Sequence, residues 1–491
     1  MHRTERYHVV WSRSHVEVNQ YPPKFRRLVS EAICSCYTPV GSLLRSEFSF
    51  IKGDPFDMVQ ILPFAGWRFD LSQVGALSEV TVPPNSLIDE TLQRSLYRQH
   101  PCNAVRLVLN REEPGDASAR DRCTRADDFW RLWKREGILL REHDPAFYIL
   151  ETTFKSSGDE RTRWSVIARL QLPDSGESDS EIPTVVKADA ERVADQSALR
   201  RVCHASLVPV VALLADTTGA DSDPRSLSDH LELVVRQVPP IECHGEDGVR
   251  HRLWPLTNPT LCSELQRRFA NFSMCIIGGY EEYLAAKADP DRARSSDPND
   301  ASRSVLACLI PADDPGFESL PHLLSRSLPT PMLAEQIPEL LGSEFQCQFV
   351  GSEPTASEDA AELARINSEQ PCLAVGTNDG TWRIVSDAAL LAPPTNELLI
   401  DRINRRINHV TSTNEAPISH RFVETSSGLA KQSQALFKSS PSSLQFIEPA
   451  RTSDDLLTLC HAGLSLPESG ARLCPGVPTG LTFLSTQNPG A

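Results

Sequence analysis

A double glycine followed by an aromatic residue and two acids is the segment of this sequence best suited to chemistry. Gly278 and Gly279 precede Tyr280, Glu281 and Glu282. Glycine lets backbone N–H groups come close to an anion, so the pair could form an anion-binding nest before a helix. The two acids could instead hold a cation as a carboxylate pair. The structural alternative is a tight bend, followed by acids that only complement a helix dipole.

Basic side chains elsewhere in the chain could complete an anion site. His251 lies between Arg250 and Arg252, and this run could be a basic patch for an anion. The alternative is a solvated segment that leads from a loop into a strand. Arg68 is a further cation in an apolar stretch. We predict one candidate pocket from these residues: Gly278, Gly279, Tyr280, Glu281, Glu282, Arg68, His251 and Arg252.

Other motifs with catalytic or metal-binding chemistry are not found in the sequence. Cys34 and Cys36 are separated by one residue, which is not a usual zinc-ligand spacing. Asp313 and Asp314 precede Pro-Gly, a pattern typical of a turn. There is no Gly-x-Ser-x-Gly elbow, Walker loop, dinucleotide fingerprint or paired-cysteine zinc site. We therefore predict no metal and no cofactor.

The composition is that of a globular protein with an acidic surface. The chain has 491 residues, of which 40% are hydrophobic and 23% charged, and its formal net charge is -16. This charge disfavours sequence-independent electrostatic binding to nucleic acid or to anionic lipid. A basic run with Arg402, Arg405 and Arg406 is best interpreted as a helix surface. The partners stay unknown, and a small-molecule ligand is possible.

Export and membrane insertion are not expected. The chain begins with MHRTERYHVVWSRSH, which lacks an apolar signal-peptide core. The longest apolar run, 207–215, is shorter than the roughly 20 residues that span a bilayer. Thirteen scattered cysteines suit free thiols in a reducing compartment. These features favour a cytoplasmic location.

Three parts of the chain differ in character. Residues 1–57 are slightly basic, and we expect them to be a disordered extension or the result of a wrongly assigned start, with translation beginning at Met58. Residues 58–390 carry most of the motifs and form the main domain or domains. Residues 391–491 form a C-terminal α/β segment that packs on the main domain.

Strand-like and helical patterns alternate along the chain. This alternation predicts an α+β (mixed α/β) fold with mixed sheets and packed helices. Strands are expected at 103–109, 147–154, 164–172, 207–214, 304–310 and 443–447, and helices at 127–136, 188–204, 261–271, from 396 onward, and at 453–462.

Six phrases stand in one order along the chain: PFAGWRF (63–69), VPPNSLI (82–88), CNAVRL (102–107), DGVRHRLW (247–254), ADDPGF (312–317) and AGLSLPESGARLCPGVPTG (462–480). In this order and at this spacing, they resemble the family known as domain of unknown function 1015. A single short phrase is weak support, whereas several collinear phrases are strong support.

The family's most distinctive phrase is similar to ADGHHRYExA, and here it corresponds to IGGYEEYLAA (277–286). This resemblance implies a ParB/sulfiredoxin-like element, related to nucleotide-hydrolysing partition proteins and a free-serine kinase. Relative to the family, Gly278 replaces Asp, Tyr280 and Glu281 replace the two His residues, and Glu282 replaces Arg. The lysines of the C-terminal phrase are replaced as well, by Ser469 and Gly476, and a middle phrase has changed to ADAERVADQ (188–196) and VCHASLVP (202–209).

These replacements imply a family member that has lost its reaction. Two carboxylates would face a phosphoryl group that carries roughly two negative charges, so repulsion replaces attraction unless a divalent cation intervenes. We therefore expect a catalytically degenerate protein with a binding or regulatory role. The alternative is a kinase-like phosphotransferase in which the acids recruit Mg²⁺ and a nucleotide. DNA binding, by analogy with partition proteins, is disfavoured by the acidity and the missing Arg.

Overall fold

The computed structural model describes most of the chain from Gln60 onward. The predictions made for residues 1–57, for Met58 and for Cys34 and Cys36 concern residues outside this set, and they stay predictions. The described residues are 60–156, 158–173, 182–218, 225–245, 248–294, 297, 300–328, 332–351, 372–386, 399–411, 418–422, 438, 442–448, 450–466 and 471–487.

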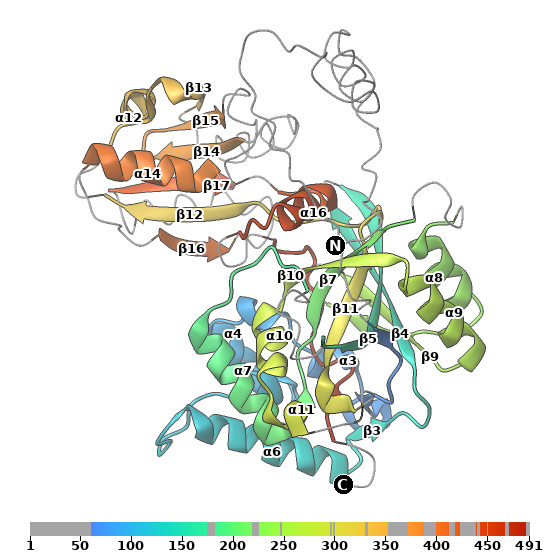
Figure 1. The fold of residues 1–491 in the computed structure, drawn as a ribbon. Helices are drawn as coiled ribbons and strands as arrows, with labels where there is room; N and C mark the ends of the chain where they lie inside the picture. The colour runs from blue at the N-terminus through green and yellow to red at the C-terminus, as the bar shows by residue number, and fades with distance from the viewer. Residues whose placement is uncertain are drawn as a thin grey trace, which may run out of the picture. The chain divides into compact units, whose positions relative to one another are not determined.

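An eight-stranded mixed sheet carries the elements that form the site (Figure 1). Its strands are ordered β10-β7-β11-β5-β4-β9-β8, and β1 pairs with β5. β7 and β11 run parallel, and the other pairs are antiparallel. The bounds are β1 Ile61–Leu62, β4 Phe147–Ser156, β5 Asp159–Gln171, β7 Val210–Asp216, β8 Ile241–His244, β9 Arg250–Leu256, β10 Phe272–Gly278 and β11 Ser304–Pro311.

The central strands are apolar because both faces of the sheet are covered. Every residue of β11 is buried, and β11 reads as a near-continuous hydrophobic run, the pattern of a strand with packed helices on both sides. β4 and β5 form a long hairpin near Gly158, whose φ of 92° is a value that glycine adopts without strain. The sheet is thus a rigid base for the loops that leave its ends.

Helices lie on both sides of this sheet, with α8 and α9 on one side and α6, α7 and α10 on the other (Figure 1). α10 packs against β7, β11 and α7, and α7 also packs against α6. The bounds are α2 Leu71–Val74, α3 Leu77–Val80, α4 Glu90–Gln99, α5 Val105–Val108, α6 Ala119–Arg135, α7 Ala190–Cys203, α8 Leu227–Val235, α9 Pro259–Phe269, α10 Tyr280–Lys287 and α11 Pro290–Arg294.

Helix α7 has clear local reasons to begin and end where it does. The Asp189 side chain accepts a hydrogen bond from the Arg192 backbone N–H and caps the N-terminus, and His204 ends the helix in a left-handed conformation. Buried Arg200 forms a 2.7 Å ion pair with buried Asp289, just beyond α10. This pair fixes α7 against the segment that follows α10.

A second, six-stranded sheet has the order β13-β15-β14-β17-β12-β16. Its strands come from both sides of residue 390, where the sequence predicts a domain boundary. Helix α14 buries Ile403 and Ile407, which are four residues apart on one face. The bounds are β12 His322–Ser327, β13 Phe345–Gly351, β14 Cys372–Thr377, β15 Gly380–Ser386, β16 Ile418–Phe422, β17 Ser443–Glu448, α12 Ile337–Leu341, α14 Leu399–Thr411 and α16 Ser453–His461. Two small sheets pair β2 Trp67–Phe69 with β3 Leu139–Arg141, and β6 Ala205–Ser206 with β18 Leu484–Ser485.

The predicted α+β fold class is confirmed, but the strand predicted at 103–109 is wrong. That stretch contains the short helix α5, in which Asn103 Oδ1 accepts a hydrogen bond from the Val105 backbone N–H. Arg106 donates to the carbonyl oxygens of His100 and Tyr97. Alternating apolar residues favoured a strand, and these specific contacts stabilise a helical turn instead.

Candidate functional site

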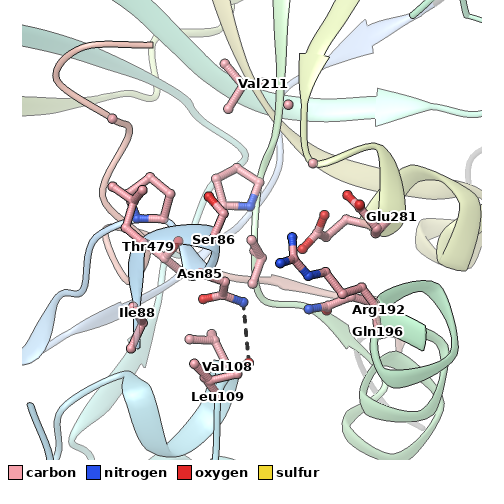
Figure 2. A pocket seen from close by; sticks show the side chains of 18 of the residues that line it. Asn85, Ser86, Ile88, Val108, Leu109, Arg192, Gln196, Val211, Glu281 and Thr479 are labelled. Atoms are coloured by element: carbon pink, nitrogen blue, oxygen red, sulfur yellow. Dashed lines mark hydrogen bonds between the residues drawn. The ribbon is translucent and has the colours of Figure 1, made fainter. Parts of the chain in front are cut away.

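A pocket of about 390 Å³ lies beside the double glycine (Figure 2). Its volume is at the lower end of the range for small-molecule sites, so it suits a metabolite-sized ligand. The lining residues come from 84–88, 107–110, Arg122, Cys123 and Ala126 of α6, Val186 and Lys187, α7, 208–211, 277–282 and 471–479.

Several of the family-like phrases converge on this pocket, although they lie far apart in the sequence. VPPNSLI, CNAVRL, IGGYEEYLAA and the C-terminal phrase each contribute lining residues, as do ADAERVADQ and VCHASLVP. PFAGWRF, DGVRHRLW and ADDPGF contribute none. The fold therefore gathers most of the chain's distinctive segments around one cavity.

Gly279 begins α10 in a conformation that suits only glycine. Its φ is 69° and its ψ 31°. A Cβ atom there would lie 2.9 Å from both the Pro209 carbonyl oxygen and Val210 Cα, which are backbone atoms that cannot move aside easily. At Gly278 a Cβ would meet only the Val211 side chain, at 3.7 Å. The tight bend before α10 therefore depends on Gly279.

The carboxylates of Glu281 and Glu282 occupy two helix N-termini. Glu281 Oε1 accepts a hydrogen bond of 3.2 Å from the backbone N–H of Asp189, directly before α7. Glu282, in the first turn of α10, is half-buried, and its carboxyl bonds its own backbone N–H. Burial, and then repulsion by Glu281, raises the pKa of Glu282 to about 8. Each acid thus takes a position where a helix would otherwise favour an external anion.

Basic side chains also line the pocket, and the sequence prediction did not include them. Lys187 and Arg192 are exposed at its rim, and the charge of Arg192 opposes the rise in the pKa of Glu282. Arg122 and Arg472 line the pocket as well. Arg122 Nη2 lies 3.6 Å from Asp195 Oδ2, and Arg472 interacts with another group of the protein. The pocket is therefore of mixed charge.

A signal for the residues of α7 was present in the sequence. Arg192 and Gln196 are four residues apart within ADAERVADQ, so a helix must place them on one face. Both line the pocket, and Figure 2 shows them side by side on α7. The helix was predicted, but its polar face was not assigned to the site.

Asn85 lies in the lining near Ser86, Thr479 and Val108 (Figure 2). Its Nδ2 donates to the Val108 carbonyl oxygen at 3.4 Å. Because a carbonyl only accepts, Oδ1 must point away from Val108. Oδ1 is buried and has no hydrogen-bond partner among the described residues. The apolar lining consists of Leu87, Ile88, Leu107, Val108, Leu109, Val208, Val211, Ile277, Leu473 and Val477.

The wall formed by 471–479 is fastened to the large sheet. Arg163 of β5 is buried and donates to the carbonyl oxygens of Cys474 at 3.0 Å and Pro475 at 2.6 Å. Burial lowers the pKa of Arg163 to about 10, which leaves it charged at neutral pH. A Cβ atom on Gly476 would lie 2.6 Å from Pro84 Cγ. This segment therefore packs directly on 84–88.

Tyr280, another of the predicted residues, is not part of the lining. Its ring stacks on Tyr283 of the same helix, with centroids 5.8 Å apart and planes inclined by 13°. Tyr283 is buried, and its hydroxyl accepts a hydrogen bond from the Ile182 backbone N–H at 3.3 Å. The Tyr280 ring therefore supports α10 from outside the pocket.

Arg68 and Arg252 do not line the pocket either. Arg68 of β2 is paired with Glu142, with Nε 2.6 Å from Oε1. Arg252 of β9 is paired with the buried carboxylate of Glu151 on β4. Each arginine thus forms an ion pair with a nearby carboxylate that lies outside the pocket lining.

His251 is buried beside Arg252 and is likewise absent from the lining. Its Nδ1 lies 3.0 Å from Thr152 Oγ1. Burial, and then the nearby Arg163, lowers the pKa of His251 to about 4, so the ring is neutral at pH 7. A neutral, buried imidazole cannot supply the positive charge that an anion site requires.

Metal and membrane sites were also sought in the described part of the chain. It contains no group of three or more His, Cys, Asp or Glu side chains that could hold a metal ion. Asp314 Oδ1 accepts from the Gly316 backbone N–H at 2.8 Å, as expected for the predicted turn. Within the same residues, no helix combines the length and apolar character needed to cross a bilayer.

Comparisons with known proteins were made for the chain. The family model described as "Protein of unknown function (DUF1015)" matches residues 61–389. No curated protein matches. Among solved structures, the chain is similar to "SbnI with C-terminal truncation from Staphylococcus aureus", with 8% identity and a TM-score of 0.30, over 66% of this chain and 87% of that chain. A TM-score this low carries no argument about the present fold or function.

Proposed function

Because the chain belongs to the DUF1015 family of proteins of unknown function, its role must be argued from the pocket, and we propose that it binds a small molecule without catalysing phosphoryl transfer. The binding would serve a regulatory or carrier role. The pocket supports this proposal by its size and its largely apolar lining, which bury a compact ligand.

The observation that carries the proposal is the placement of the two acids. Glu281 is hydrogen-bonded to the Asp189 N–H, and Glu282 lies against the start of α10. A phosphoryl group carries roughly two negative charges at pH 7, and it would have to displace the Glu281 carboxylate and would gain no counter-charge from the Glu282 carboxyl group, which only ionises further at higher pH. Lys187 and Arg192 are exposed to solvent, which screens their attraction, while Arg122 lies 3.6 Å from Asp195 and Arg472 interacts with another group of the protein. Phosphate binding is therefore disfavoured, and transfer with it.

A thermal-shift experiment tests the proposal. The full chain is heated with ATP, ADP or CTP, each with and without Mg²⁺, and we expect no stabilisation. A ligand at a hundred times its dissociation constant would add about 2.7 kcal/mol, which is readily measured. A nucleotide shift that depends on Mg²⁺ would instead support the alternative, a kinase-like phosphotransferase in which the acids recruit the metal.

A charge-reversal variant adds a positive control. Glu282→Arg replaces the half-buried acid by the family's cation, and inorganic phosphate or ATP should then stabilise the protein. Glu191→Arg makes the same charge change at an exposed residue of α7 that does not line the pocket. Equal responses from both variants would mean that surface charge alone attracts the anion.

The finer predictions from the sequence also stay proposals. The strand, glycine turn and helix formed by β10, Gly279 and α10 support a ParB/sulfiredoxin-like element, because that element was expected to have this order. The net charge of -16 supports a role without nucleic-acid or membrane binding. A cytoplasmic location, with no metal or other cofactor, is proposed on the sequence features given above.

A further inference from the structure

The interior of the pocket offers hydrogen-bond acceptors. Glu281 uses Oε1 for the Asp189 N–H, which leaves its other oxygen for further bonds. Glu282 adds a second carboxyl at the same end. A ligand that fits these groups must present N–H or O–H donors.

The charges differ between the rim and the interior. Lys187 and Arg192 are exposed, and Figure 2 shows the Arg192 guanidinium directed toward Glu281. Arg122 and Arg472 are half-buried in the lining, where Arg122 lies 3.6 Å from Asp195 and Arg472 interacts with another group of the protein. Glu281 and Glu282 are half-buried and belong to a helix start that is fixed by Gly279. A cationic group can therefore reach the acids from the open side, and it replaces Arg192 as their counter-charge.

From this arrangement, and resting on the proposed binding function, we propose that the pocket takes an amphipathic organic amine, with its ammonium group at Glu281 and Glu282 and its apolar body on the lining around Val211 and Leu473. A metal ion would need more ligands than this pair, and the described residues hold no cluster of three. An ammonium group needs only acceptors.

The test uses three six-carbon probes that differ only in the head group: hexylammonium, 1-hexanol and hexanoate. Each is titrated into the full chain at pH 7 by calorimetry. We expect hexylammonium to bind about tenfold more tightly than 1-hexanol, the size of one charge-assisted hydrogen bond, and hexanoate to bind more weakly than either. Because the raised pKa keeps Glu282 largely protonated at pH 7, amine binding should also release protons to the buffer.

Three variants separate this proposal from its rivals. Glu282→Gln should lower hexylammonium affinity about tenfold, abolish proton release and leave 1-hexanol affinity unchanged. Arg192→Gln removes the competing counter-charge and should raise amine affinity, whereas an anionic ligand would then bind less tightly. Glu191→Gln, at an exposed residue outside the lining, should change nothing.

The outcomes distinguish the two proposals. Equal affinity for hexylammonium and 1-hexanol, or a preference for hexanoate, would refute the proposal that the ligand is an amine. The proposed binding function would not be affected by that result. Failure of all three probes to bind overturns the ligand class too, because each supplies the apolar body. Binding of Mg²⁺–ATP with displacement of hexylammonium overturns the proposed function itself.

Discussion

Replacing Glu282 by glutamine should stabilise the protein at neutral and alkaline pH but not in acid. In the folded state, burial and Glu281 raise the pKa of Glu282 from 4.5 to about 8. A carboxyl with a raised pKa costs stability once pH exceeds its unfolded value, because folding then favours protonation. The cost therefore begins near pH 4.5, grows as pH rises and is complete above about pH 8. Glutamine is uncharged throughout and carries no such cost.

The magnitude follows from the size of the shift. A rise of about 3.5 pKa units corresponds to about 5 kcal/mol at 1.36 kcal/mol per unit, and this is an upper limit. Glu282 is half-buried and Arg192 opposes the shift, so solvent and the guanidinium reduce the cost. Glutamine also weakens the carboxyl's bond to the helix N-terminus. We expect a net gain of about 1–2 kcal/mol at pH 8.5 and close to none at pH 5.

Urea unfolding of wild type and Glu282→Gln at several pH values between 5 and 8.5, followed by tryptophan fluorescence, measures this difference. Groups that do not interact with Glu282 titrate alike in both proteins and cancel in the comparison. Glu191→Gln, an exposed acid in the first turn of α7, is the matched control, and its difference from wild type should not vary with pH. Parallel stability curves for wild type and Glu282→Gln would refute the argument that Glu282 is held in a desolvated, like-charged setting.

Two further variants test how the pocket is built. Gly279→Ala should destabilise the protein by about 2–4 kcal/mol, because the new Cβ atom clashes with the Pro209 carbonyl and alanine is strained in the left-handed conformation. Gly463 also has a positive φ of 66° but has open space around it, so Gly463→Ala should cost only about 1 kcal/mol. Equal shifts of the thermal unfolding midpoint in the two variants would contradict the clash. Arg163→Met leaves the Cys474 and Pro475 carbonyls without their donor, so we expect the free energy of unfolding to fall by about 2–4 kcal/mol and amide hydrogen exchange in 471–479 to become faster. Unchanged exchange there would show that other contacts hold this segment in place.

The sequence was informative where the signal was local. Strands β4, β5, β7 and β11 of the large sheet, helix α7 and the glycine turn before α10 follow from apolar runs, caps and one residue type. The sequence did not show which other side chains lie beside that turn, because this depends on the three-dimensional fold. Arg68, Arg252 and His251 carry the right chemistry, but their partners come from neighbouring strands: Glu142 directly follows β3, which pairs with β2, and Glu151 and Thr152 lie on β4, which pairs with β9. Strand pairing of this kind depends on the whole sheet and cannot be read from a run of residues.

Two positions at which the sequence resemblance implies a replacement, Gly476 and Glu281, have specific partners in the fold. Gly476, which the resemblance aligns with a lysine, allows the C-terminal segment to pack directly on Pro84; a Cβ atom there would lie 2.6 Å from Pro84 Cγ. Glu281, which the resemblance aligns with a histidine, accepts a hydrogen bond from the Asp189 N–H that precedes α7. These contacts close the walls around a pocket of about 390 Å³. Positions that hold the walls together in this way support the proposal that the cavity still binds a ligand.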